Sequence, residues 1–115
     1  MDTIKFKFMD EEIECKLLVD SYLNGNLAIL LMSKDENGDY DIWCDLTTNI
    51  PAYDELNKTE AYVNTKELTD LIGIIKKYKL AKSTDIRVSS GFNIYELFEF
   101  DMDEVNKYKL EKGSE

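Results

Sequence analysis

The sequence predicts an α+β fold in which an antiparallel sheet packs against one main helix, and three observations lead to this prediction. Apolar and polar residues alternate in four segments of the first half, as in strands with one buried face. Apolar residues then recur at helical spacing over about residues 65–79. The two-residue period returns in the last third of the chain. The 115 residues are expected to form a single domain over 1–110, followed by a flexible tail at 111–115.

The first half is expected to form a four-stranded meander, with strands at 4–8, 12–17, 27–32 and 39–46. The first two strands pair as a hairpin across the polar residues 10–12. Asn24-Gly25 and Asn37-Gly38 mark the next two turns, because Asn-Gly readily adopts the positive φ that tight turns need. The third strand is almost wholly apolar, which indicates a central place in the sheet.

The second half is expected to supply the main helix and the remaining strands. Residues 47–60 show no clear period, and Pro51 disfavours ordinary strand pairing there. The helix is expected to follow Asn64 as N-cap, since Glu67 three residues later completes a capping-box pattern. Gly73 inside the helix is expected to mark close packing on the sheet. The remaining expected elements are one or two strands around Ile86–Val88 and Ile94–Phe100, and a short C-terminal helix that begins near Asp101.

Composition argues against several classes of function. Asp and Glu number 24 against 14 Lys and Arg, and the resulting net charge of −10 disfavours direct binding of nucleic acid. The chain has no histidine, which is the commonest general base and metal ligand. Cys15 and Cys44 lack metal-binding spacing and are expected to be small apolar residues on strands. We therefore expect no enzymatic activity, no cofactor and no metal ion.

No membrane contact is expected either. The longest apolar run, Leu27–Met32, is far shorter than the stretch of about 20 residues that crosses a bilayer. The first residues do not combine a basic segment with an apolar one, so no secretory signal is expected. The expected location is the cytoplasm.

Acidic residues gather in the first half, where residues 1–60 hold 14 acids and 5 lysines. The densest part is 35–60, with 8 acids and one base. On a regular strand Asp39, Asp41 and Asp45 would share one face, about 6.6 Å apart per two-residue step, comparable to the phosphate spacing of a nucleic-acid strand. Such a face would imitate nucleic acid and occupy a basic groove on another protein. An ordinary solvated acidic surface is the alternative.

Trp43 would lie on the same face as Asp41 and Asp45, where an exposed indole suits a partner-binding hot spot. Packing under the helix is the alternative.

The turn that starts at Asp35 has the composition of a calcium loop, but Gly38 is fourth in it rather than sixth, so a hairpin turn is expected. The residues predicted to bind a protein partner are Asp39, Asp41, Trp43, Asp45, Asp54 and Glu55.

Several phrases in order along the chain carry a resemblance to a family. They are IKFKF at 4–8, EIECKL at 12–17, NLAI at 26–29, DENG at 35–38, LTTNIP at 46–51, AYVNT at 61–65 and SGF at 90–92. Together they resemble a family of small acidic domains of unknown function from mobile elements of gut bacteria. Some members of that family resemble anti-CRISPR inhibitors of Cas9. The resemblance covers residues 4–101 and diverges around 52–60.

The resemblance implies a non-enzymatic inhibitor that binds a basic, nucleic-acid-binding surface of a defence protein such as Cas9. Under this hypothesis the partner is a protein, and the chain touches neither nucleic acid nor membrane. The alternative is an accessory scaffold or interaction domain with no anti-defence role. Such a domain would self-associate as a homodimer through a strand edge such as Ile94–Phe100.

Overall fold

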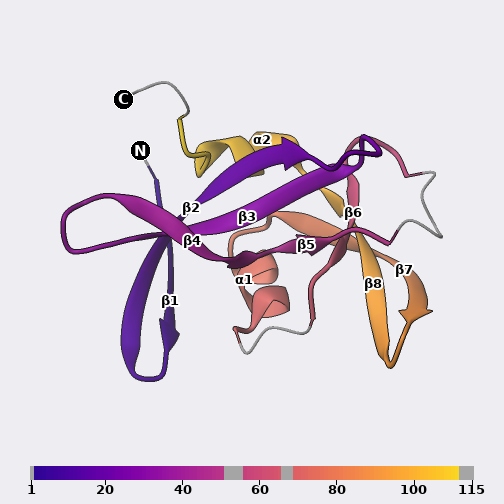
Figure 1. Ribbon diagram of the computed structural model, residues 1–115, viewed down its shortest axis with the longest axis horizontal. Helices are drawn as coiled ribbons and strands as arrows, with labels where there is room; N and C mark the ends of the chain where they lie inside the picture. Colours follow the sequence, from indigo (N-terminus) through magenta and orange to yellow (C-terminus); the bar gives the residue numbers. More distant parts are fainter. Residues whose placement is uncertain (1, 51–55, 66–68, 112–115) are drawn as a thin grey trace.

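The computed structural model describes residues 2–50, 56–65 and 69–111 and shows an α+β fold, as predicted (Figure 1). The first half forms the expected meander, a four-stranded antiparallel sheet in the order β1-β2-β3-β4 that we call the meander sheet. The largely apolar third strand lies inside it, between β2 and β4. Its strands are β1 (Ile4–Phe8), β2 (Glu11–Ser21), β3 (Leu27–Lys34) and β4 (Tyr40–Asp45).

The remaining strands form a second antiparallel sheet instead of extending the first, in the order β5-β6-β8-β7. Two of its strands, β5 and β6, fall in or next to the region that was expected to be irregular. Strand β8 lies between β6 and β7, and its residues 97–99 pair with β6, so the expected sheet edge over Ile94–Phe100 is wrong for these residues. Within the described strands, residues 93–96 pair only with β7. The strands are β5 (Thr47–Thr48), β6 (Glu60–Val63), β7 (Ala81–Ser90) and β8 (Asn93–Phe100).

Helix α1 (Leu71–Lys77) is shorter than the expected 65–79 and begins at a different cap. Its N-cap is Asp70, whose carboxylate accepts a hydrogen bond from the Gly73 N–H at 3.0 Å. Asn64 instead donates its backbone N–H to the carbonyl of Leu46, and Glu67 lies outside the described residues. A Cβ on Gly73 would lie 2.8 Å from Asp70 Cγ, so this glycine makes room for the cap and not for the sheet.

Helix α2 (Met102–Lys107) is the short C-terminal helix that the sequence predicts, with Asp101 as its N-cap. After α2, the carbonyl of Tyr108 accepts the N–H of Leu17, and the N–H of Leu110 donates to the carbonyl of Leu17. These bonds complete the edge of β2 beyond the end of β1. Most of the expected tail, 112–115, lies outside the described residues. Neither described helix is long and apolar enough to cross a membrane.

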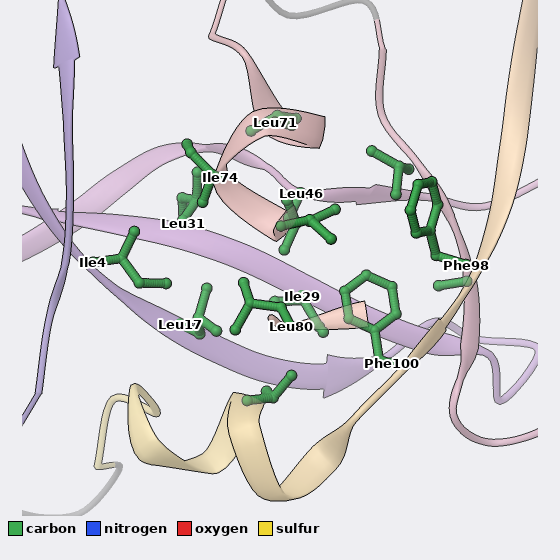
Figure 2. Close-up of a cluster of buried hydrophobic side chains, with 14 of the residues drawn as sticks. Ile4, Leu17, Ile29, Leu31, Leu46, Leu71, Ile74, Leu80, Phe98 and Phe100 are labelled. Carbon is green, nitrogen blue, oxygen red and sulfur yellow. The ribbon is translucent and has the colours of Figure 1, made fainter. Parts of the chain in front are cut away.

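The main hydrophobic core lies between the two sheets and is closed by both helices. Figure 2 shows side chains of the meander sheet, such as Ile4 and Leu17, pointing toward Phe98 and Phe100 of the second sheet. Leu80, which follows α1, is fully buried among them. Because successive residues of a strand point to opposite faces, β8 also contributes Tyr95 and Leu97 to a smaller cluster on the other side of the second sheet.

Candidate functional site

Two acidic hairpin turns lie at the same end of the meander sheet. Strands β2 and β3 run antiparallel with Cys15 opposite Ser33, so the start of β2 lies beside the end of β3. The turn between β1 and β2 and the turn between β3 and β4 therefore lie at the same end of the strands, although their hairpins diverge beyond Cys15 and Ser33, one pointing downward and the other to the left in Figure 1. We call this region, residues 10–14 and 35–41, the acidic end.

The acidic end holds eight carboxylates and no lysine or arginine. Seven of them are exposed, whereas Glu14 is half-buried. Burial raises the pKa of the Tyr40 hydroxyl, and the nearby carboxylate of Glu14 raises it further. The carboxylates belong to Asp10, Glu11, Glu12, Glu14, Asp35, Glu36, Asp39 and Asp41. A concentration of like charge on two projecting turns gives this end a strongly negative potential.

The turn between β3 and β4 is a hairpin turn, as the sequence predicts. The carboxylate of Asp35 accepts the N–H groups of Asn37 and Asp39, both at 2.9 Å, and Gly38 takes a φ of +88°. The Asp35 carboxylate therefore fixes the turn, while Glu36 and Asp39 remain exposed. Among the described residues, no three Cys, Asp or Glu side chains lie close enough together to hold a metal ion.

A β-bulge in β4 separates two of the predicted acidic residues. Leu31 lies opposite Cys44 but Met32 lies opposite Ile42, so Trp43 is an extra residue in the ladder. Directly paired residues share a face of the sheet. Asp45 pairs with Leu30 and Asp41 with Ser33, three positions apart on β3, and the two carboxylates therefore lie on opposite faces. The expectation of one continuous acidic face from Asp39 to Asp45 is wrong.

Trp43 packs between the meander sheet and the approach to α1. Its ring meets Phe8 edge-on at 5.3 Å between centroids and Phe6 at 6.1 Å. Its indole N–H donates to the hydroxyl of Thr69 at 3.0 Å, next to the helix cap Asp70. Trp43 is half-buried, and its contacts match the alternative that places it under the helix.

Of the other predicted residues, Asp39 and Asp41 belong to the acidic end, whereas Asp45 lies about 20 Å along the chain from Asp39 at 3.3 Å per residue. Asp54 and Glu55 lie outside the described residues. The predicted binding residues did not include the four acids at 10–14, although the predicted order of the strands already places them near the turn at 35–41. In a meander, the first and third turns lie at the same end of the sheet.

The two cysteines occupy buried strand positions, as the sequence predicts. Cys15 and Cys44 form no disulfide, and both contribute to the main core. Burial raises the pKa of Cys15 to about 12, and the nearby Cys44 and Glu14 add to the increase. A thiol that holds its proton at neutral pH is a poor nucleophile.

Comparison with known families gives one match. The model of a domain of unknown function, DUF4313, matches residues 16–114. The chain belongs to this family. No curated protein and no solved structure matches it.

The DUF4313 match covers most of the fold and part of the acidic end. It includes the chain from the middle of β2 to the end of α2, and with it the turn at 35–41 and Trp43. Strand β1 and the acids at 10–14 precede the matched region. The family is one of unknown function, so the match assigns no activity to the chain.

Proposed function

We propose that this DUF4313 protein is a non-enzymatic inhibitor that places its acidic end against a basic, nucleic-acid-binding surface of a bacterial defence protein such as Cas9. The observation that carries the proposal is the concentration of eight carboxylates on two turns at one end of the sheet, where the flanking bases are Lys7, opposite Glu12, and Lys34, next to Asp35. In this proposal the protein comes from a mobile element and acts in the cytoplasm, where it competes with nucleic acid for the partner.

The geometry of the acidic end supports this mode of binding. The two hairpins project from the sheet in different directions (Figure 1). The exposed carboxylates of either turn can enter a groove that accepts a nucleic-acid backbone. Cas9 holds its nucleic acids in positively charged channels. Opposite potentials would accelerate encounter with such a channel and reject acidic partners. The bulge at Trp43 restricts the acidic surface to the turns, so Asp45 is not part of the proposed contact.

The experiment is a DNA cleavage assay with purified Cas9 loaded with guide RNA, to which the protein is added in increasing amounts at fixed salt. The wild-type chain should inhibit cleavage. A triple variant, Glu11→Gln, Asp39→Asn and Asp41→Asn, should require at least about tenfold more protein, because it removes three charges from the contact. The inhibition by the wild-type chain should also weaken as salt is raised.

The matched control is Asp2→Asn, Asp85→Asn and Glu99→Gln, which removes the same charge from exposed residues outside the acidic end. This control should inhibit like the wild-type chain. Failure of the wild-type chain to inhibit, or equal loss in both triple variants, would count against the proposal.

The hairpin of β7 and β8 favours a second candidate, a scaffold that self-associates. Phe92 at its tip is fully exposed, and Ile94 and Ile86 are 65% and 51% exposed. Exposed apolar groups gathered on one projecting hairpin are typical of association surfaces. In this candidate the contact is made by the side chains of the hairpin and by residues 93–96 of β8, which among the described strands pair only with β7.

Sedimentation over a hundredfold range of concentration separates the two candidates. Self-association predicts a dimer that the Phe92→Ser, Ile94→Thr variant converts to monomer. A monomer at every concentration removes this candidate and leaves the inhibitor proposal in place.

A further inference from the structure

The hollow between the two helices has the opposite character from the acidic end. It measures about 890 Å³ and lies where the end of α1, the start of β7, the end of β8 and α2 meet. Four lysines line it: Lys76, Lys79, Lys82 and Lys107. Four of the 14 basic residues of a chain with net charge −10 thus surround one concave site, which we call the lysine pocket.

The backbone brings these lysines together from separate segments. Lys79 takes a left-handed conformation with φ +57°, which turns the chain from α1 toward β7. The N–H of Asp101 donates to the carbonyl of Leu80 at 2.8 Å, which holds the start of α2 beside the start of β7. Lys82 follows on β7, directly opposite Glu99. The hydrogen bonds around the pocket fix its walls without engaging the lysine side chains.

Three acidic residues also line the pocket. Two of them, Asp101 and Glu104, already have partners of their own, whereas Glu99 lies opposite Lys82 on the neighbouring strand. The Asp101 carboxylate caps α2 by accepting the N–H groups of Asp103 and Glu104. Glu104 forms an ion pair with Lys107 at 2.7 Å. Within the part of the chain that the structure describes, no carboxylate forms an ion pair with Lys76, Lys79 or Lys82. Three ammonium groups are therefore available to a bound anion.

We propose that the lysine pocket binds an oligophosphate, as a free chain or as the phosphate group of a nucleotide. Several lysines around one concavity match a ligand that carries several charges on adjacent phosphates. The apolar floor contains Ala81 and Phe100, but Phe100 is only 3% exposed and offers no ring on which a base can stack. The phosphates are thus the group recognised. This inference is independent of the proposed function, because it concerns another surface.

The net negative charge of the whole molecule should make the affinity for an anion depend strongly on the number of charges that the anion carries. Exposed acids elsewhere repel an anion at long range, so only a ligand with several charges in contact with the lysines should be held. Binding of triphosphate should therefore be stronger than that of orthophosphate. It should also weaken as salt is raised.

The test is calorimetric titration of the whole chain at low salt with sodium tripolyphosphate and, separately, with ATP. Both should bind at one site and compete with each other. Equal affinities assign the site to the phosphate chain, and tighter binding of ATP assigns it to a nucleotide. The Lys79→Gln, Lys82→Gln variant should weaken binding at least about tenfold, since two charged contacts are lost.

The matched control is Lys16→Gln, Lys34→Gln, which removes the same charge from the meander sheet and should change the affinity less than twofold. Amide chemical-shift changes in the wild-type chain should centre on residues 76–82 and 99–107, which tests the site even if a variant unfolds. The proposal is overturned by the absence of saturation with both probes at millimolar concentration, by equal losses in both variants, or by shift changes elsewhere.

Discussion

Trp43 joins three parts of the fold through one side chain. Its indole ring contacts Phe6 and Phe8 of β1 while its N–H reaches Thr69 ahead of α1. Thr69 is 8% exposed, so its hydroxyl has little access to water that could replace the indole. A buried polar group that loses its partner destabilises the folded state by its desolvation cost. Trp43 therefore stabilises the bulged part of β4, and no role in partner binding is needed to explain it.

Trp43→Phe should lower the free energy of unfolding by about 2–3 kcal/mol, because the packing shrinks and the Thr69 hydroxyl loses its donor. Urea denaturation followed by circular dichroism measures this change. Thr69→Val should also lower the free energy of unfolding of the wild-type chain. The same substitution should lower it clearly less in the Trp43→Phe background. Additive costs would show that the hydrogen bond between Trp43 and Thr69 contributes nothing.

Cys15 should make the folded state less stable at alkaline pH. Burial raises its pKa from 9.0 to about 12, so the folded thiol keeps its proton at pH values where the unfolded thiol has lost it. Stability from this group is therefore complete below about pH 9 and falls as the pH rises toward 12, by at most about 1.4 kcal/mol per pH unit.

Urea denaturation at pH 8 and pH 10 tests this, with Cys15→Ala as the control that removes the titrating group. The wild-type chain should lose more stability between the two pH values than Cys15→Ala does. Equal losses would show that the thiol titrates normally in the folded state.

Helix α1 begins after Asp70 and not after Asn64, because a contact distant in the sequence engages Asn64. Asn64 and Glu67 have the spacing of a capping box, but a local pattern does not reveal that the Asn64 backbone pairs with Leu46, far away in the sequence. Asp70 caps the helix instead, and Gly73 leaves the space that its carboxylate occupies. The predicted helix is confirmed over Leu71–Lys77.

Gly73→Ala should change the stability of the wild-type chain little, because a gain in helix propensity of about 1 kcal/mol is offset by displacement of the Asp70 cap. In an Asp70→Ala background the same substitution should stabilise the chain by about 1 kcal/mol. Thermal denaturation of the four proteins measures the difference. Equal effects of Gly73→Ala in both backgrounds would contradict the proposed conflict between cap and methyl group.

Local sequence patterns also predict some strands, whereas others depend on pairing between distant segments. Alternation and Asn-Gly turns identify β1 to β4, since both are local properties of the sequence. The bulge at Trp43 leaves no such mark, yet it moves Asp45 to the other face. Strands β5 and β6 contain two and four residues, too few for a period to be seen. The central place of β8 depends on pairing with β6, which no local pattern predicts.

Two regions on the surface of the whole molecule differ in charge, although one core joins the elements that carry them. The acidic end concentrates eight carboxylates, whereas four lysines surround the hollow between the helices. Repulsion within the acidic end opposes folding, and salt screens it. The charge counts were available from the sequence, but the fold was needed to show which charges lie together.

Raising sodium chloride from 10 to 300 mM should therefore increase the melting temperature of the wild-type chain by a few degrees, as seen by circular dichroism. The Glu11→Gln, Asp39→Asn, Asp41→Asn variant should melt higher than the wild-type chain at low salt and respond less to salt. A melting temperature that falls with salt, or the same response in both proteins, would contradict this account of the acidic end.

The two turns of the acidic end are the proposed binding surface, and amide hydrogen exchange shows whether a partner covers them. Exchange is measured for the chain alone and in complex with guide-loaded Cas9. Peptides that cover residues 9–16 and 34–42 should become protected on binding, and peptides that cover 84–95 should not change. Protection confined to the β7–β8 hairpin, or no protection in either turn of the acidic end, would contradict it.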